Sequence, residues 1–496
     1  MFAVALFCIA CAAYWAWRLK TAKTTEPPHF PGGWPIVGHA PSLIGDSCKL
    51  WNGINDLTNK SYEIGGVVSA SIGPRTVYIV TDPDDSFTVL NTCLEKDGFY
   101  DFAKPWLGEG LVTGKLSIWK NHRKYLNPAF SQIVLDTFMG VLNSQARKLV
   151  KDLEKEVGKG YFDHWTYTRH NALETICCKF TYLFRTSGLL PMGVDFTDSN
   201  LNSKYVEATE QILNTMVERF MKFWWHSPYT FAWSNVKKKQ DACLKILHNM
   251  SYTALQKRKS EFNGNICAER STRFKAFMDL LLELSVEKGV LNDREIREHV
   301  DTIIVGGHDT SANVLMFTMI LLGSHPEVQE KVLAEIKEVL GDGDCDVEKT
   351  DLSKLVYMEA VLKESMRVFS IVPVLARTLD KDVKLKNYTL SAGRTCFLFV
   401  FGIHKHPVWG PDVHEFKPER WLDPGKLPDS PNAFAAFGLG RRQCIGKAYA
   451  LMSLKILVTH LVRNYKITAD HTKVRLKIDV MLKPDEGHCV SIERRT

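Results

Sequence analysis

The stretch Phe437-Gly438-Leu439-Gly440-Arg441-Arg442-Gln443-Cys444-Ile445-Gly446 says more about the fold than any other part of this chain of 496 residues. Glycines flank a single cysteine beside two arginines, just ahead of a helical pattern over 447–462. Glycine lets a backbone approach a flat prosthetic group closely. The arginines suit acidic substituents on such a group, and the cysteine suits a thiolate–metal bond. The alternative is a glycine turn that holds a buried, inert cysteine.

Composition sets broad limits on the class of protein. Hydrophobic residues make up 45% of the chain, which is ordinary for a globular protein with a sizeable core. The formal net charge of +7 is small and scattered, so it argues against a nucleic-acid partner. The twelve cysteines are spread thinly, no CxxC pair recurs, and no Cys/His cluster has zinc spacing. We therefore expect most of them to be reduced and buried.

The N-terminus indicates a location. Residues 2–17 carry no charge and come near the short limit for a segment that spans a bilayer. Arg18, Lys20 and Lys23 follow directly, which places the C-terminal side in the cytoplasm. A cleaved signal peptide is the alternative, but its basic n-region is missing. We expect an anchor over 1–20 and a proline-rich connector over 21–40.

The rest of the chain, 41–496, reads as one catalytic domain that is mainly α with a minor β portion (α+β). A β-hairpin is predicted over 66–80 and a second strand-like group over 383–400, with loop-rich sequence from 403 to 436. Helical periodicity is predicted over the following ranges: 129–157, 204–225, 234–262, 273–287, 293–323, 326–340 and 351–369.

The predicted helix over 293–323 contains Gly306-Gly307-His308-Asp309-Thr310-Ser311 in apolar surroundings. Two glycines inside a helix cost roughly 1 kcal/mol each relative to alanine, which suggests room for a ligand against the backbone. Asp309 and Thr310 are candidates to relay protons to a bound oxygen species. A helix kink with capping polar groups is the alternative.

Three further motifs are weak individually. Glu364 and Arg367 lie at i, i+3 on one helix face, Arg420 follows within Pro418-Glu419-Arg420-Trp421, and Trp119 and Arg123 lie one helical turn apart. Together with the cysteine loop and the glycine-rich helix, these motifs occur in the order found in one family. From Pro27 onward the chain resembles the haem-thiolate monooxygenases of the cytochrome P-450 superfamily.

That resemblance implies a role for each matching residue. Cys444 is implied to be the axial ligand of haem iron, with Phe437 packed beside its loop. A second set of residues is implied to hold the haem propionates: Trp119, Arg123, Arg377 and Arg442. Asp309 and Thr310 match a proton-delivery pair, and Glu364, Arg367 and Arg420 match a buried structural triad.

The resemblance also implies the cofactors and partners. These are haem b and dioxygen, and a separate NADPH-cytochrome reductase, because the chain shows no flavin or nucleotide motif. Cytochrome b5 is a second candidate donor. Exposed cations are expected on the face that meets them: Lys120, Lys124, Arg441 and Lys447. The implied location is the endoplasmic reticulum membrane, with one anchor and the catalytic domain on the cytoplasmic side.

The segment Pro105–Thr113 resembles the microsomal clan that includes fatty-acid ω-hydroxylases. Many of its members carry a glutamate at the place of Gly306 that bonds to haem, so we expect noncovalent haem here. A dense aromatic group over 220–233 is either helix core or a lipid-dipping lid above a substrate entrance. The expected substrate is a lipophilic small molecule such as a fatty-acid derivative, hydrocarbon, volatile signal or xenobiotic, beside membrane lipid. The alternatives are a haem-thiolate isomerase or dehydratase, and a haem protein that binds ligands without turnover.

Overall fold

The computed structural model of the protein describes residues 25–73, 75–181, 199–264, 277–286 and 288–495. Its longer helices are α2 (Ser47–Glu63), α3 (Pro83–Thr92), α5 (Leu116–Leu126), α7 (Met139–Leu153), α8 (Trp165–Thr181), α9 (Ser199–Met221), α11 (Asn235–Gly264), α12 (Phe277–Val286), α13 (Asp293–Ser324), α14 (Pro326–Leu340), α16 (Val356–Val368) and α18 (Lys447–Asn464). Short helices join them: α4 (Lys104–Leu107), α6 (Gln132–Asp136), α10 (Pro228–Ala232), α15 (Lys349–Leu352) and α17 (Val400–His404).

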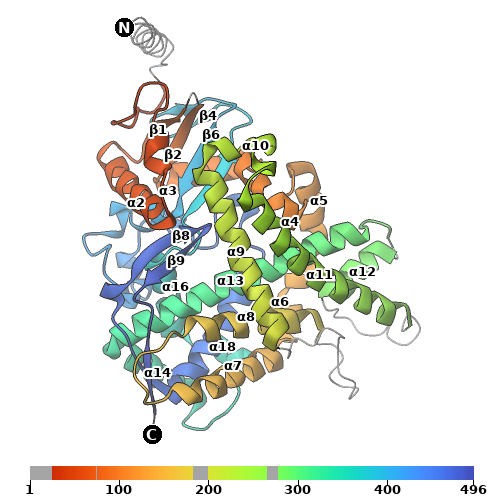
Figure 1. The fold of residues 1–496 in the computed structure, drawn as a ribbon. Coiled ribbons are helices and arrows are strands. Elements are labelled where there is room, and N and C mark those ends of the chain that lie inside the picture. The colour runs from red at the N-terminus through yellow and green to blue at the C-terminus, as the bar shows by residue number, and fades with distance from the viewer. Residues whose placement is uncertain (1–24, 74, 182–198, 265–276, 287, 496) are drawn as a thin grey trace, which may run out of the picture.

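The strands form one larger sheet and three ribbons. The sheet has the order β1 (Val67–Ile72), β2 (Arg75–Val80), β6 (Thr395–Phe399), β3 (Val374–Thr378), in which β2 and β6 run parallel and the other pairs antiparallel. The ribbons pair β4 (Val383–Lys384) with β5 (Thr389–Leu390), β7 (Tyr465–Thr468) with β10 (Ser491–Arg494), and β8 (Arg475–Asp479) with β9 (Met481–Glu486). The sheet lies at one end of the molecule and the helices fill the other (Figure 1).

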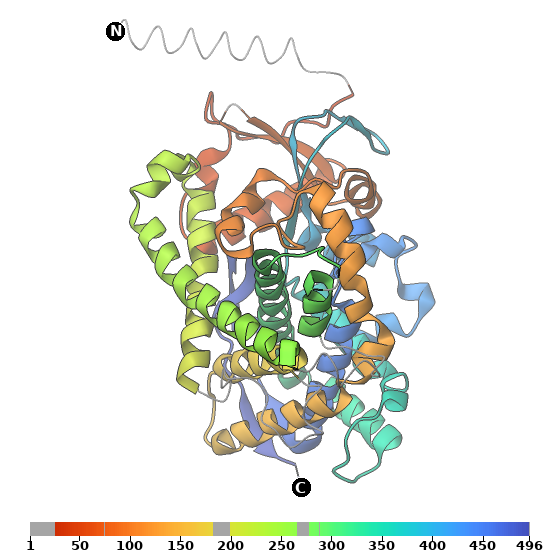
Figure 2. The same ribbon diagram turned by 90° about the vertical axis from the view of Figure 1, so that its right-hand side faces the viewer.

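Helix α13 forms the axis of the helical part. It starts with a capping box, in which Asn292 accepts from the N–H of Glu295 and the Glu295 carboxylate accepts from the N–H of Asn292. It is then buried along most of its length, which its apolar sequence requires. In Figure 2, α9 and α11 run along one side of α13 and α5 (orange) stands on the other. This packing fixes the residues of α13 that the site uses.

The predicted mainly α fold with a minor β portion is confirmed, and the hairpin of β1 and β2 lies where it was predicted. The single helix expected over 129–157 is wrong. The segment divides into a 3₁₀ turn, α6 and α7, because the Thr137 hydroxyl donates to the carbonyl of Val134 and ends α6. Helices α2, α3 and α8 were not predicted.

The expected anchor over 1–20 lies outside the described residues. Among the residues that the structure does describe, no helix is both long enough and apolar enough to cross a membrane. The described part of the connector, from residue 25, leads along the sheet: Phe30 donates its backbone N–H to the carbonyl of Ser69 on β1.

Close packing of α13 on the β7 ribbon predicts the effect of one added methyl group. A Cβ at Gly323 would come within 2.7 Å of the backbone nitrogen of Ala469 and 2.9 Å of its Cβ. We expect Gly323→Ala to lower the free energy of unfolding by about 1–3 kcal/mol, because the backbone must shift. Chemical denaturation measures this. Gly343→Ala is the matched control, since an added Cβ there meets nothing within 4 Å. Equal stability of the two variants would contradict the account.

Candidate active site

The cysteine loop is shaped by two glycines with left-handed backbone. Gly438 and Gly440 have φ of 72° and 69°, and a Cβ at Gly440 would press on the backbone of Leu90 at 3.0 Å. The backbone N–H of Cys444 donates to the carbonyl of Phe437 at 2.8 Å, which closes the loop. The chain then enters α18 at Lys447. The sequence therefore dictates this turn locally, since other residues rarely adopt positive φ.

Cys444 is an exposed residue, although many protein atoms lie near its sulfur. Burial raises the pKa of the thiol, and a backbone N–H of Gly446 and the charges of Arg123 and Lys447 act in the opposite direction. These groups stabilise a thiolate relative to a thiol. The position offers a sulfur ligand with positive charge beside it.

Two arginines from distant parts of the chain meet near this loop. Arg377 on β3 is 2% exposed, and the guanidinium of Arg442 lies 4.5 Å from the ring centroid of Trp119 on α5. One Arg442 nitrogen, Nη2, donates to the carbonyl of Gly114 at 2.9 Å. Its Nε and Nη1, and the Nε of Arg377, are buried without a hydrogen-bond acceptor among the described residues.

The pKa values of both arginines are lowered, which shows that their charged forms are destabilised in this position. Burial, and then the charge of Arg377, lowers the pKa of Arg442 to about 10, although the charge of Glu95 opposes this. Burial also lowers the pKa of Arg377. Buried cations without an acceptor are expensive, so the arrangement calls for an anionic partner that the chain does not itself provide.

Arg123 lies in a different relation to the loop. Its Nη1 donates to the carbonyl of Gln443 at 3.0 Å and its Nε to Oδ1 of Asn127 at 2.8 Å. Burial lowers its pKa, while Cys444 acts to raise it. Arg123 thus ties α5 to the backbone directly before the cysteine.

Lys96 is a residue that sequence reasoning missed. It forms a backbone bridge with Arg377, and its ammonium lies 4.1 Å from the ring centroid of Tyr100. Burial, followed by the charges of Arg377 and Arg442, lowers its pKa well below the usual range. Glu95-Lys96-Asp97 reads as an ordinary solvated charge run, so no sequence signal could have identified Lys96.

These residues fit the implied haem. The unsatisfied donors of Arg377 and Arg442 suit the two carboxylates of haem, the glycine loop lets a flat group approach, and Cys444 supplies sulfur. Helix α13 also has open space beside Gly306, where an added Cβ would meet nothing within 4 Å.

The Gly306–Thr310 turn is a continuous part of α13. The hydroxyl of Thr310 donates back to the carbonyl of Gly306 at 2.6 Å, so the polar side chain is satisfied within the helix. Gly306 is exposed and Thr310 partly exposed, whereas their neighbours Val305, His308 and Asp309 are buried. Asp309 does not stand alone: its Oδ2 lies 3.3 Å from the ammonium of Lys483 on β9.

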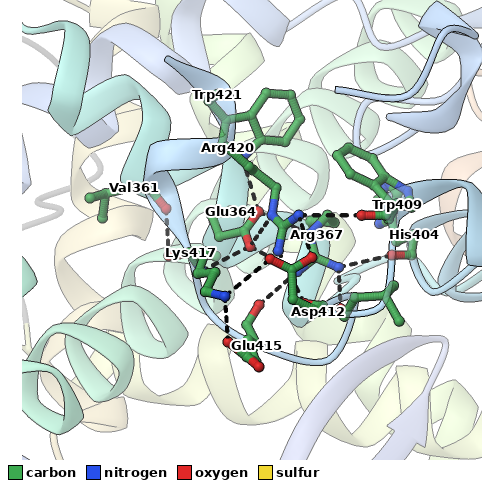
Figure 3. A network of polar contacts seen from close by, with 12 residues as sticks. Val361, Glu364, Arg367, His404, Trp409, Asp412, Glu415, Lys417, Arg420 and Trp421 are labelled. Atoms are coloured by element: carbon green, nitrogen blue, oxygen red, sulfur yellow. Dashed lines mark hydrogen bonds and ion pairs between the residues drawn. The ribbon is translucent and has the colours of Figure 1, made fainter. Parts of the chain in front are cut away.

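The predicted triad of Glu364, Arg367 and Arg420 is brought together in full (Figure 3). Arg367 donates from Nε and Nη2 to the two Glu364 oxygens at 2.9 and 2.8 Å, and Arg420 donates to Oε1 at 2.9 Å. The indole N–H of Trp421 and the backbone N–H of Lys417 donate to the same carboxylate. The other arginine N–H groups donate to backbone carbonyls and, from Nη1 of Arg420, to Oδ1 of Asp412 at 3.2 Å, so this buried charge cluster is compensated.

The surface residues separate into two groups. The cations expected to meet an electron donor, Lys120, Lys124, Arg441 and Lys447, are all exposed. The aromatic group over 220–233 divides. Phe231 is buried and Phe220 packs against Phe99 at a centroid distance of 4.8 Å, whereas Tyr229 and Trp233 are 83% and 91% exposed. The helix-core alternative thus describes part of this segment, and the lipid-dipping lid stays a prediction.

Comparison with known proteins agrees with this geometry. The sequence model of the family described as Cytochrome P450 matches residues 27–489. The chain is 30% identical to human "Cytochrome P450 4V2" over 486 residues, which is 94% of this chain and 90% of that protein. It is 32% identical over 484 residues to the Rattus norvegicus protein of the same name (94% and 90%) and 30% identical over 501 residues to Drosophila melanogaster "Cytochrome P450 4c3" (96% and 91%).

The triad predicts how stability depends on Glu364. Burial would raise the pKa of Glu364, but the hydrogen bond and charge of Arg367 and the charge of Arg420 outweigh it and hold the pKa below its usual range. We expect Glu364→Gln to lower the free energy of unfolding by roughly 3–5 kcal/mol, because two buried arginines lose their anion. Denaturant titration at pH 7 measures this.

The sign of the pH dependence follows from the lowered pKa. The stability that Glu364 contributes is present in full above its unfolded pKa and is lost as the pH falls through the folded value, so the difference between variant and native protein should shrink in acid. Glu415→Gln is the control, since its side chain is 61% exposed and pairs only with Lys417 among the ion pairs of the described residues. A loss as small for Glu364→Gln as for the control would show that the cluster does not stabilise the fold.

Proposed function

The chain belongs to the cytochrome P450 family and is a monooxygenase, and we propose that it inserts one oxygen atom of dioxygen into a lipophilic small molecule, with fatty acids as the first candidates. The observation that carries the proposal is the pair of arginines with unsatisfied buried donors, Arg377 and Arg442, which act on each other beside the loop that carries Cys444. When bound, haem with a cysteine-thiolate ligand supplies the chemistry of O–O cleavage.

On the cysteine side, the proposed work of the chain is binding and orientation. Cys444 ligates the iron, and backbone N–H groups of its loop tune the sulfur. Arg377 and Arg442 hold the haem carboxylates, with Trp119 stacked beneath Arg442. Arg123 keeps the loop against α5, Phe437 packs beside the ligand, and Lys96 adds a third cation. The haem is haem b.

On the α13 side, the proposed work is proton handling. Gly306 leaves the backbone accessible, and the Thr310 hydroxyl sits at the border of this open space. Its proton already points to the carbonyl of Gly306, so its oxygen is free to accept a proton from, or hydrogen-bond to, a neighbouring donor. Asp309, one residue earlier and buried, is the proposed source of protons behind it.

The proposed substrate class is supported by the resemblance to the clan of fatty-acid ω-hydroxylases and by a set of exposed aromatic side chains. Helix α10 lies toward the same end of the molecule as the described connector (Figure 1). In and around it are the exposed aromatic residues Phe223, Trp224, Tyr229 and Trp233. Such a surface suits contact with membrane lipid, from which apolar substrates enter. We propose an anchored location at the endoplasmic reticulum membrane, with the catalytic domain in the cytoplasm.

Electrons are proposed to come from an NADPH-cytochrome reductase, with cytochrome b5 as a second donor. Arg441 and Lys447 flank Cys444 in sequence, and Lys120 and Lys124 lie on α5, whose Arg123 bonds to the cysteine loop. These four exposed cations suit an acidic partner surface.

Two substitutions test the proposed division of labour. Thr310→Ala should leave haem bound and NADPH consumption running, while the product formed per NADPH falls by at least about tenfold, because proton handling is lost. Cys444→Ala should abolish both the product and the red-shifted Soret band of the carbon monoxide complex. Product analysis with dodecanoic acid, purified reductase and NADPH measures the effect. Undiminished product per NADPH in Thr310→Ala would refute the proposed role of Thr310. The absence of product from the native chain would instead indicate a protein that binds ligands without turnover.

The mode of haem attachment is a separate prediction. Gly306 has no carboxylate with which to form an ester, so we expect noncovalent haem. Extraction with acidified organic solvent should release the haem completely, as absorbance of the two phases would show. As the matched comparison, Gly306→Glu restores a carboxylate at this position and should retain haem after turnover. Retention of haem by the native chain would contradict the proposal.

A further inference from the structure

A buried lysine joins the proposed proton source to the C-terminal hairpin. The Lys483 ammonium, on β9, lies 3.3 Å from Oδ2 of Asp309 and 3.1 Å from Oδ2 of Asp479 on β8. All three side chains are at most 3% exposed. Figure 1 shows the hairpin (dark blue) packed beside α2 and α9, so residues far apart in sequence meet here.

The charges in this cluster do not balance. Two carboxylates share one ammonium, and neither contact has hydrogen-bond geometry: the Nζ of Lys483, both oxygens of Asp479 and Oδ2 of Asp309 have no hydrogen-bond partner among the described residues. Burial raises the pKa of Asp479 to about 7; the charge of Lys483 acts to lower this pKa, and the charge of Asp309 acts to raise it. Burial acts to lower the pKa of Lys483, but both carboxylates outweigh it and raise it. The excess negative charge is therefore balanced by one proton held near neutral pH.

Charged groups from two neighbouring helices face the cluster. Glu210 on α9 acts on both Asp479 and Lys483, and it pairs with Arg169 on α8. His308 on α13 is buried with neither ring nitrogen hydrogen-bonded within the described chain, and burial lowers its pKa to about 4, so it stays neutral. His170 on α8 and Lys483 also act on His308. Glu210 is the most exposed of these acids, at 35%, and marks the side from which solvent protons arrive.

The hairpin holds Asp479 in place at a cost. Val480, the residue after Asp479, has φ of 71°, which a β-branched residue rarely adopts. Such a conformation persists only where the surroundings impose it. The β8–β9 pairing of Asp479 with Met481, the hydrogen bond from the N–H of Leu482 to the carbonyl of Ile371 and the ion pair of Asp479 with Lys483 all hold this turn.

We propose that Asp479 and Lys483 are positioning residues that form one proton-holding unit with Asp309, and that this unit, rather than Asp309 alone, supplies Thr310. The inference rests on the proposed roles of Asp309 and Thr310. In the transfer, Lys483 gives a proton to Asp309 and receives one from Asp479, so the ammonium begins and ends protonated. Asp479 is reprotonated from solvent on the Glu210 side.

If Asp479 and Lys483 served only to attach the hairpin to α13, their replacement would not change the rate of proton transfer. The experiment separates this structural role from the proposed role in proton transfer. Three variants of the haem-loaded full chain are compared with the native protein: Asp479→Asn, Lys483→Met and Lys483→Arg. The control is Lys477→Met, which removes a partly exposed lysine paired with Asp485 on the same hairpin. Dodecanoic acid is the probe, with reductase and NADPH.

We expect Asp479→Asn to slow product formation about tenfold, because a proton transfer is lost. The solvent isotope effect, which is the rate in H2O divided by the rate in D2O, should at least double. Lys483→Met should lower the amount of product formed per NADPH consumed, and Lys483→Arg should restore most of that amount. Lys477→Met should match the native chain. Variants that lose thermal stability but keep the native rate and isotope ratio would overturn the proposal.

A measurement independent of turnover completes the test. The difference between the infrared spectra of the native chain and Asp479→Asn should contain the C=O band of a protonated carboxyl that titrates with a midpoint near pH 7. The comparison with the variant is needed because burial also raises the pKa of Asp301 to about 7, and the Asp301 band remains in both proteins. Absence of the Asp479 band from this difference overturns the inference whatever the activity. If the band behaves as expected but the native chain oxidises no fatty acid, the proposed substrate class fails and the shared proton stands.

Discussion

Two arginines with buried N–H groups that lack acceptors set the constraint around which this structure is arranged. Arg377 comes from β3 and Arg442 from the cysteine loop, and neither forms an ion pair within the described chain although three of their N–H groups are buried. A protein tolerates such donors only where something anionic completes them. The glycine turns of the loop, the Trp119 ring under Arg442 and the Cys444 sulfur all lie around that same point, so one bound group satisfies several otherwise costly features at once.

The molecule treats buried charge in three ways, and each serves a different purpose. The Glu364 cluster is fully hydrogen-bonded and behaves as a rigid part of the core. The Asp309–Lys483–Asp479 cluster is compensated only in part, so it retains a proton that can move. Arg377 and Arg442 form no ion pair among the described residues, and we propose that they bind an anion. The degree of compensation thus follows function: complete for structure, partial for proton handling and absent for cofactor binding.

The sequence predicted what depends on short spacing. The loop at Cys444, the helix with Gly306–Thr310 and the pairing of Glu364 with Arg367 all follow from local patterns. Contacts between distant segments could not be predicted. Helix α16 begins where Glu335 of α14 accepts from the N–H groups of Tyr357 and Met358, and no local signal marks that start. Helix α8 shows no amphipathic period because buried polar residues such as Thr168 and Asn171 face its neighbours. Lys96 and Lys483 read as surface charges and are recognisable only in three dimensions.

Esterified haem offers the most direct test of the central claim, that the unsatisfied arginines bind the acid groups of the cofactor. The measurement is the thermal unfolding midpoint of the full chain with added haem and with haem dimethyl ester, whose two carboxylates are neutral. The account predicts that haem raises the midpoint substantially and that the diester raises it far less, because binding stabilises in proportion to affinity. An equal rise with both compounds would mean that Arg377 and Arg442 do not hold the carboxylates.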